Sequence, residues 1–164
     1  MKNLEIERKF LIKMPDIKML EVLPDIGIAD IIQTYTTVGV RLRKWTEQGR
    51  TTYIKTVKKH LSDLTRIEEE SEISAEEYNS LMLLADPERN SLTKTRYRYP
   101  FKGKLIEIDV FPFWERQAFC EIELKGEDEE FSLPDFIEVI KEVSADKAYR
   151  NYALTKNIPK EENF

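Results

Sequence analysis

The chain has 164 residues, of which 41% are hydrophobic and 10% aromatic, enough for the core of one compact domain over residues 1–164. Its 26 basic and 31 acidic residues give a net charge of -5, which argues against a nucleic-acid partner. Cys120 is the single cysteine, so an internal disulfide and a cysteine-based metal cluster are excluded. The sequence has no stretch resembling a signal peptide or a membrane span. We therefore expect a cytoplasmic protein with no membrane partner.

Strands are predicted over most of the first 125 residues, because apolar and polar side chains alternate there. The expected strands span residues 3–12, 33–37, 38–46, 50–59, 64–73, 93–101, 104–111 and 117–125.

Helices are expected to be fewer. Ser74 and Glu77 form a capping-box pattern that predicts a helix over 75–85. Pro134 predicts a helix over 135–143, and Ser144 predicts another over 145–155. Residues 14–26, bounded by prolines, are expected to form a weaker helix or an irregular segment.

The first predicted strand places charged residues together on one face. In LEIERKFLI, residues 4–12, the side chains of Glu5, Glu7 and Lys9 point to one side of the strand. Two carboxylates at i and i+2 lie about 6.5–7 Å apart, which costs about 2–2.5 kcal/mol of repulsion at an effective dielectric of ~20. Water or a cation must relieve that repulsion.

Other strands sort their charges in the same way. The sets that share a face are Arg41 with Arg43, Glu68 with Glu70, Lys94 with Arg96, Glu107 with Asp109, and Glu121 with Glu123, while Lys55 shares a face with Tyr53 and Val57. The wet side of an antiparallel sheet explains any single strand, but it does not explain why acids and bases gather on different strands. A closed barrel with a charged lumen explains the whole set, and such a lumen suits a polyanion bridged to carboxylates by divalent cations.

The chain resembles a known family at several motifs in the same order. LEIERK is similar to the ExExK signature of the CYTH domain, the triphosphate tunnel metalloenzymes, and the similarity continues through QTY at 33–35, RLR at 41–43, RIEEE at 66–70, KTRY at 94–97 and CEIEL at 120–124. The resemblance is strongest to the short bacterial inorganic triphosphatases. It implies an α+β fold, with an antiparallel eight-stranded closed β-barrel that forms the triphosphate tunnel and helices packed around it.

The resemblance also implies roles for individual residues. A divalent cation, Mg²⁺ or Mn²⁺, would be held by Glu5, Glu7, Glu121 and Glu123, with Glu68, Glu70 and Asp109 as further acidic tunnel residues. The triphosphate would be bound by Lys9, Arg41, Arg43, Lys55, Lys94 and Arg96. Lys9 and Tyr35 would be catalytic, orienting the attacking water and helping to deprotonate it.

Several functions fit this pattern. The preferred one is a metal-dependent hydrolase that cleaves a small-molecule triphosphate, inorganic tripolyphosphate, to pyrophosphate and phosphate. The alternatives are a class IV adenylate cyclase or an organic (thiamine or nucleoside) triphosphatase on the same scaffold, or a non-catalytic polyphosphate- or nucleotide-binding module. A glycosidase fits less well, because its chemistry needs two acids but not six surrounding cations. The chain is expected to be a monomer or a homodimer.

Overall fold

The computed structural model describes the backbone of residues 2–164 and the side chains of residues 4–164. Its elements, in chain order, are β1 (Lys2–Lys13), α1 (Ile17–Glu21), β2 (Gly27–Tyr35), β3 (Arg41–Glu47), β4 (Arg50–His60), β5 (Thr65–Ile73), α2 (Ala75–Met82), β6 (Leu92–Phe101), β7 (Lys104–Val110), β8 (Gln117–Glu123), β9 (Val139–Glu142), the 3₁₀ helix η1 (Lys147–Tyr149) and α3 (Asn151–Leu154).

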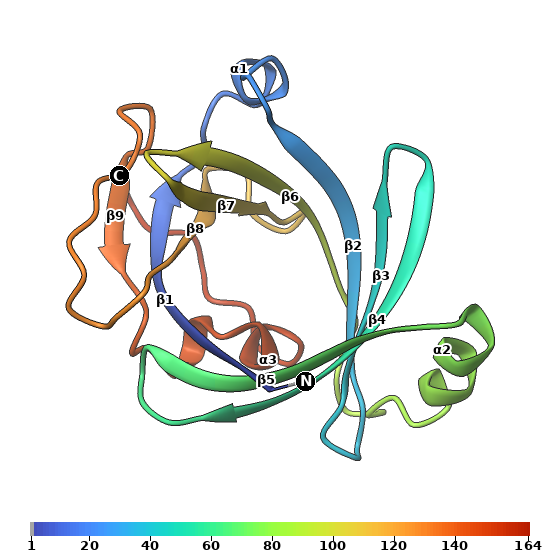
Figure 1. Cartoon of the computed structure of the whole chain (residues 1–164). Coiled ribbons are helices and arrows are strands. Elements are labelled where there is room, and N and C mark those ends of the chain that lie inside the picture. The colour runs from blue at the N-terminus through green and yellow to red at the C-terminus, as the bar shows by residue number, and fades with distance from the viewer. Residues whose placement is uncertain (1) are drawn as a thin grey trace.

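Eight of the strands close into an antiparallel barrel (Figure 1). They follow the order β5-β4-β3-β2-β6-β7-β8-β1, and a further pairing between β5 and β1 joins the two ends of the sheet. The predicted fold, an antiparallel eight-stranded closed barrel with helices around it, is therefore confirmed. None of the helices in the described part of the chain has the length and apolar character to cross a membrane.

Strand β1 divides its pairing between several partners. Residues 2–6 pair with β5, and residues 7–13 pair with β8. Beyond residue 9 the edge that faced β5 is taken by the short strand β9, which pairs with Phe10, Leu11 and Ile12. Glu5 and Glu7 therefore lie where β1 changes partners.

Two hairpins have the turn chemistry that their tight loops require. Gln48 and Gly49 connect β3 to β4, and Lys102 and Gly103 connect β6 to β7. All four residues have positive φ angles, 51° and 75° in the first loop and 50° and 76° in the second. A two-residue loop with both φ angles positive twists in the sense of the flanking strands, and glycine adopts the second position without strain.

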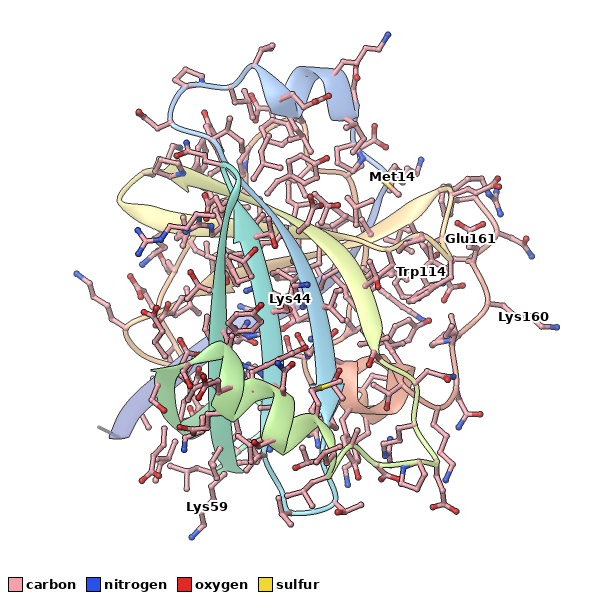
Figure 2. The ribbon with its side chains drawn as sticks, turned by 90° about the vertical axis from the view of Figure 1, so that its right-hand side faces the viewer. Met14, Lys44, Lys59, Trp114, Lys160 and Glu161 are labelled. Atoms are coloured by element: carbon pink, nitrogen blue, oxygen red, sulfur yellow. The ribbon has the colours of Figure 1, made fainter. Side chains whose placement is uncertain are left out.

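Apolar residues pack on both faces of the barrel wall. The outer core lies between the wall and the segment that includes α1, and its buried members include Ile6, Phe10, Ile12, Leu20, Tyr97, Ile106, Ile108, Cys120 and Ile122. The inner core closes one end of the barrel and consists of Leu11, Leu92, Phe111, Trp114, Phe119, Val143, Tyr149 and Leu154. Figure 2 shows Trp114 beside the C-terminal segment that carries Glu161, and the indole Nε1 donates to the carbonyl oxygen of Pro159 at 3.0 Å.

The helix predictions succeed only in part. The Ser74 cap is confirmed, since its hydroxyl accepts a hydrogen bond from the Glu77 amide at 3.0 Å, although α2 ends at Met82. The predicted helix over 135–143 is wrong, because this segment forms a turn followed by β9, which satisfies the free edge of β1. The predicted helix over 145–155 is interrupted at Arg150, whose ψ of 143° is extended, leaving η1 and the single turn of α3.

Candidate active site

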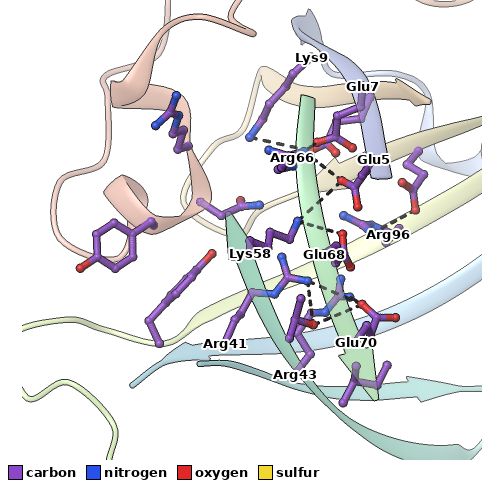
Figure 3. Close-up of a pocket in the computed structure, with 18 of the residues that line it drawn as sticks. Glu5, Glu7, Lys9, Arg41, Arg43, Lys58, Arg66, Glu68, Glu70 and Arg96 are labelled. Carbon is purple, nitrogen blue, oxygen red and sulfur yellow. Dashed lines mark hydrogen bonds and ion pairs between the residues drawn. The ribbon is translucent and has the colours of Figure 1, made fainter. Parts of the chain in front are cut away.

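The barrel encloses a cavity of about 1120 Å³ that is lined mainly by charged side chains (Figure 3). The charged residues along its length include Glu5, Glu7, Lys9, Arg41, Arg43, Lys58, Arg66, Glu68, Glu70, Arg96, Arg98, Glu107, Glu121 and Glu123. The sorting of charge read from the sequence therefore corresponds to the inner face of the barrel.

Strand register brings charges from distant parts of the chain together. Across β3, β4 and β5, Arg41 pairs with Thr56, which in turn pairs with Glu70. On the other side of the barrel Lys9 of β1 lies opposite Glu121 of β8. Each inner-facing residue thus has an inner-facing neighbour about 4.5–5.5 Å away on the next strand.

The basic wall of the cavity contains Arg41 and Arg43 of β3. Arg43 Nη2 donates to Glu70 Oε2 at 2.9 Å, and Arg41 Nη2 donates to Thr56 Oγ1 at 3.3 Å. The Nε atoms of both arginines are buried and have no hydrogen-bond partner in the described structure. Burial and the neighbouring Arg41 lower the pKa of Arg43. Buried donors without acceptors, in a cluster of like charge, are stabilised by an anionic ligand.

Arg96 completes this wall and is held from behind by Asp109. Its Nε donates to Asp109 Oδ1 at 2.8 Å and its Nη2 to Oδ2 at 3.0 Å, while its Nη1 donates to Glu107 Oε2 at 3.0 Å. Lys94 Nζ also donates to Asp109 Oδ2, at 2.9 Å. The Arg96 and Lys94 cations keep the pKa of the buried Asp109 carboxyl well below its usual range.

The predicted placement of Lys94 and Asp109 in the tunnel needs correction. Their side chains are 0% and 1% exposed, and neither lines the cavity. The Lys94 ammonium lies 5.9 Å from the centre of the Phe111 ring, beside the inner core. The two residues therefore support Arg96 from behind, because the inner face of the barrel is already filled by apolar side chains at their level.

The acidic wall of the cavity is partly neutralised by two cations. Arg66 of β5 makes an ion pair with Glu7 and another with Glu5 at 3.0 Å. Lys58 Nζ lies 3.7 Å from Glu5 Oε1 and 3.6 Å from Glu68 Oε2. Arg66 belongs to the RIEEE motif at 66–70 but was not among the predicted site residues. Both cations occupy positions between carboxylates that a divalent ion could also bridge.

The acidic wall offers the oxygen donors that a hard divalent cation prefers, but its carboxylates are not arranged around a metal position. Within residues 4–164, no three acidic, histidine or cysteine side chains are grouped closely enough to hold a metal as they stand. Glu68 Oε2 is nevertheless buried without a hydrogen-bond partner. Burial and the nearby Glu5 raise the pKa of Glu123. A buried carboxylate oxygen without a hydrogen bond and crowded like charges are both stabilised by a cation, and carboxylate oxygens are the ligands that Mg²⁺ and Mn²⁺ prefer.

Lys9 lies at the junction of the cavity and the inner core. Its Nζ donates to the carbonyl oxygen of Tyr149 at 2.9 Å, lies 3.8 Å from Glu121 Oε1, and sits 4.0 Å from the centre of the Phe119 ring. Burial lowers the pKa of Lys9, and the Glu121 carboxylate opposes this effect. The amine is therefore easier to deprotonate than an exposed lysine.

Tyr35 lines the same cavity at the end of β2. Its hydroxyl oxygen accepts a hydrogen bond from Gln33 Nε2 at 2.8 Å, and its ring lies 5.1 Å from that of Tyr152. Burial raises the pKa of Tyr35, so the phenol stays protonated at neutral pH. The group can donate a hydrogen bond to a ligand but is a poor base.

The predicted placement of Lys55 in the tunnel is wrong. Its side chain is 42% exposed, and its Nζ lies 3.0 Å from Glu77 Oε2 on helix α2, outside the barrel. On β4 the cavity is instead lined by Ile54, Thr56 and Lys58. Lys55 and Lys58 lie on opposite faces of β4. Because each face carries a lysine, the presence of a lysine does not identify the inner face. The pairing of Lys58 with Glu68 across β4 and β5 is the signal that distinguishes them.

No family model matches the chain. Similarity to curated proteins is nevertheless extensive. An inorganic triphosphatase from Nitrosomonas europaea is 34% identical over 165 residues, covering 94% of this chain and 99% of the relative. An inorganic triphosphatase from Acetivibrio thermocellus is 35% identical over 121 residues, 73% of this chain and 72% of that protein.

Solved structures show the same barrel. A crystal structure described as an inorganic triphosphatase matches with a TM-score of 0.56 at 29% identity, covering 95% of this chain and 97% of that one. A conserved hypothetical protein from Pyrococcus furiosus, 20% identical over 76% of this chain and 80% of its own, shares the fold with a TM-score of 0.52. With the charged lumen and the ExExK strand both in place, these likenesses show that the chain belongs to the CYTH family, among the short inorganic triphosphatases.

Proposed function

We propose that the protein hydrolyses a small-molecule triphosphate inside the barrel, with inorganic tripolyphosphate cleaved to pyrophosphate and phosphate. The observation that carries this proposal is the division of the cavity into two walls. Arg41 and Arg43 present buried Nε donors without acceptors, and the carboxylates of the acidic wall face the same space. A polyanion bound with a divalent cation satisfies both walls together.

The arginines perform the main part of the chemistry. Phosphoryl transfer requires little covalent participation by the protein, so positioning and charge neutralisation supply most of the rate. Arg41 and Arg43 carry forked donors that match the oxygens of a phosphate group, and Arg96 adds a positive charge beside them. Asp109 fixes the Arg96 fork through two hydrogen bonds, so this cation is already oriented before a substrate enters.

The metal proposal concerns Mg²⁺ or Mn²⁺ held by Glu5, Glu7, Glu121 and Glu123, with Glu68 and Glu70 as further acidic neighbours. When bound, such an ion neutralises phosphate charge and polarises the phosphoryl oxygens. Arg66 contacts Glu5 and Glu7 in this structure and would have to release them to admit the ion.

Lys9 and Tyr35 would handle the attacking water. Burial lowers the pKa of Lys9, which favours the neutral amine that a proton acceptor requires. The protonated Tyr35 hydroxyl would orient the water or a phosphate oxygen by donating a hydrogen bond. Burial by the inner core positions Lys9, since its ammonium rests on the Phe119 ring.

A substrate panel tests the proposed function. Tripolyphosphate, ATP and thiamine triphosphate are each incubated with Mg²⁺, with Mn²⁺ and with excess chelator, and phosphate, pyrophosphate and cyclic AMP are measured separately. We expect phosphate and pyrophosphate from tripolyphosphate, only with a metal present. Cyclic AMP as the main product would favour the cyclase, preferential cleavage of an organic triphosphate would favour that alternative, and full activity in chelator would contradict the metal proposal.

The matched variants are Glu7→Gln, in the acidic wall, and Glu88→Gln, an exposed residue outside the cavity. The first should abolish turnover and the second should leave it unchanged, with both proteins folded by circular dichroism. The cytoplasmic location remains a prediction. The monomeric or homodimeric state is also a prediction, and light scattering can test it.

A further inference from the structure

At the end of the cavity away from the inner core, Trp45, Glu47 and Arg98 form a connected group that the proposed mechanism does not use. We name it the mouth cluster. Arg98 Nη2 lies 2.5 Å from both carboxylate oxygens of Glu47, and Trp45 Nε1 donates to Glu47 Oε1 at 3.0 Å. The guanidinium carbon of Arg98 is 5.3 Å from the centre of the Trp45 ring, within cation–π range. All three side chains line the cavity.

Strand β2 provides the space in which the Glu47–Arg98 pair lies. Gly27 is paired with Arg98 in the register of β2 and β6. A Cβ atom on Gly27 would come within 3.0 Å of Arg98 Nη2 and 3.3 Å of Glu47 Oε2. The missing side chain at residue 27 therefore leaves room for this ion pair against the wall.

Arg98 extends the basic wall by one step. It follows Arg96 by two residues on the same face of β6, so it lies about 6.5–7 Å further along the strand. Its Nε is buried and lacks a hydrogen-bond partner among the side chains that the structure describes. On its own, Arg98 would hold another phosphate group beyond those bound at Arg43 and Arg96.

Glu47 opposes that role. Its carboxylate neutralises the guanidinium of Arg98, and the cross-strand neighbour of Arg98 on β7 is a second carboxylate, Glu107. Glu47 and Glu107 therefore offset the positive charges of Arg98 and Arg96, and an additional phosphate placed there meets the Glu47 carboxylate.

We infer that the Glu47–Arg98 pair sets the length of the phosphate chain, by excluding linear polyphosphates longer than triphosphate. This inference rests on the proposed function and specifies the substrate of the same site. Selectivity of this kind comes from a repulsive group directed at the longer competitor rather than from tighter contacts to the shorter one. Removing the Glu47 charge both relieves the repulsion and frees Arg98 to bind a fourth phosphate.

The test compares kcat/KM for linear tetraphosphate with kcat/KM for tripolyphosphate. In the wild type this ratio is low. Glu47→Gln raises it by about three- to tenfold, the size of effect expected from one partly exposed charge. Glu47→Asp keeps the charge and keeps the low ratio. The double variant Glu47→Gln with Arg98→Gln falls back toward the wild-type ratio, and Glu88→Gln leaves it unchanged.

A purely structural ion pair would behave differently, because loss of stability lowers both values of kcat/KM together and leaves their ratio constant. An unchanged ratio in Glu47→Gln, in a protein with the wild-type melting temperature, overturns the inference while the proposed function stands. A wild type that cleaves both chains equally also overturns it. A wild type that is inactive on tripolyphosphate contradicts the proposed function itself, and the inference with it.

Discussion

The charged and the apolar halves of the barrel interior are built on the same strands. Along the inner face, Lys9 of β1 is followed by Leu11, and Glu121 of β8 is preceded by Phe119. On strands β6 and β7 the inner-facing side chains likewise change between charged and apolar within two residues. One half holds a cavity with unsatisfied donors, and the other is a packed apolar core. The comparison teaches that alternation determines which face of a strand turns inward, while residue type determines whether that part of the interior is open or filled.

The change is abrupt, so the groups at the boundary are charged and buried together. Lys94 and Asp109 are paired with each other there, and Lys9 lies against the Phe119 ring. Substitutions in the charged half should therefore alter activity at nearly constant stability, and substitutions in the apolar half should mainly alter stability. Four predictions test that separation.

Lys9→Met should have the largest effect. The methionine side chain can still cover the Phe119 ring, so the fold should persist, but the proton acceptor is lost. We expect kcat with saturating tripolyphosphate to fall by roughly 10²–10⁴-fold. Lys13→Met is the control, because Lys13 lies on the same strand with its side chain 46% exposed. A wild-type kcat for Lys9→Met would remove Lys9 from the mechanism.

Phe119→Ala should show the opposite behaviour. Phe119 is fully buried in the inner core, with the rings of Phe111 and Trp114 at 5.6 Å and 5.1 Å. Truncation should lower the free energy of unfolding by about 3–5 kcal/mol, as measured by urea denaturation. Phe164→Ala, at a 50% exposed residue, should cost far less. Equal losses in the two variants would show that the inner core is not a packed core.

Arg43→Lys keeps the charge of the basic wall but removes the forked donor. We expect kcat/KM for tripolyphosphate to fall by roughly 10–100-fold, with little change in unfolding free energy. The neighbouring Lys44→Arg makes the reverse change on the opposite face of β3, outside the cavity, and should be neutral. If Lys44→Arg affects activity as strongly as Arg43→Lys, the assignment of inner and outer faces fails.

Lys58→Gln should alter the pH dependence of binding. Burial, with Arg41 nearby, lowers the pKa of Lys58 to about 7. Lys58 is therefore charged below that pH and neutral above it, so KM for tripolyphosphate should rise between pH values of about 6 and 8.

The expected rise is roughly two- to fivefold, as for a partly screened charge. Lys58→Gln should lose this component of the profile, whereas Lys55→Gln, on the outer face of the same strand, should retain it. Identical profiles for wild type and Lys58→Gln would show that another group titrates.

Much of the barrel follows from local sequence, because hairpin turns and alternation are short-range signals. The alternation placed Glu5 with Glu7 and Arg41 with Arg43 on shared faces, whereas the closed barrel was expected from the sorting of charge and from the CYTH resemblance. Local sequence could not correct the wrong helix prediction at 135–143, since strand β9 forms there only because β1 offers it a free edge.

Errors in the candidate site have the same origin. Lys55 and Lys58 are equivalent by composition, and only the pairing of β4 with β5 determines which one meets Glu68. Lys94 has the correct face for the tunnel, but the sequence does not show that Phe111 and Phe119 fill the interior at its level. Depth inside a barrel depends on contacts between strands far apart in the chain.

The divided pairing of β1 also has a consequence for synthesis on the ribosome. This strand is made before all of its partners, which include Glu69, Glu123 and Glu142. At ordinary rates of translation it waits on the order of ten seconds for the last of them. During that time its edges are open to pairing with other chains. Barrel closure is therefore a late and non-local event, of the kind that makes folding slow and exposes the unfinished chain to aggregation.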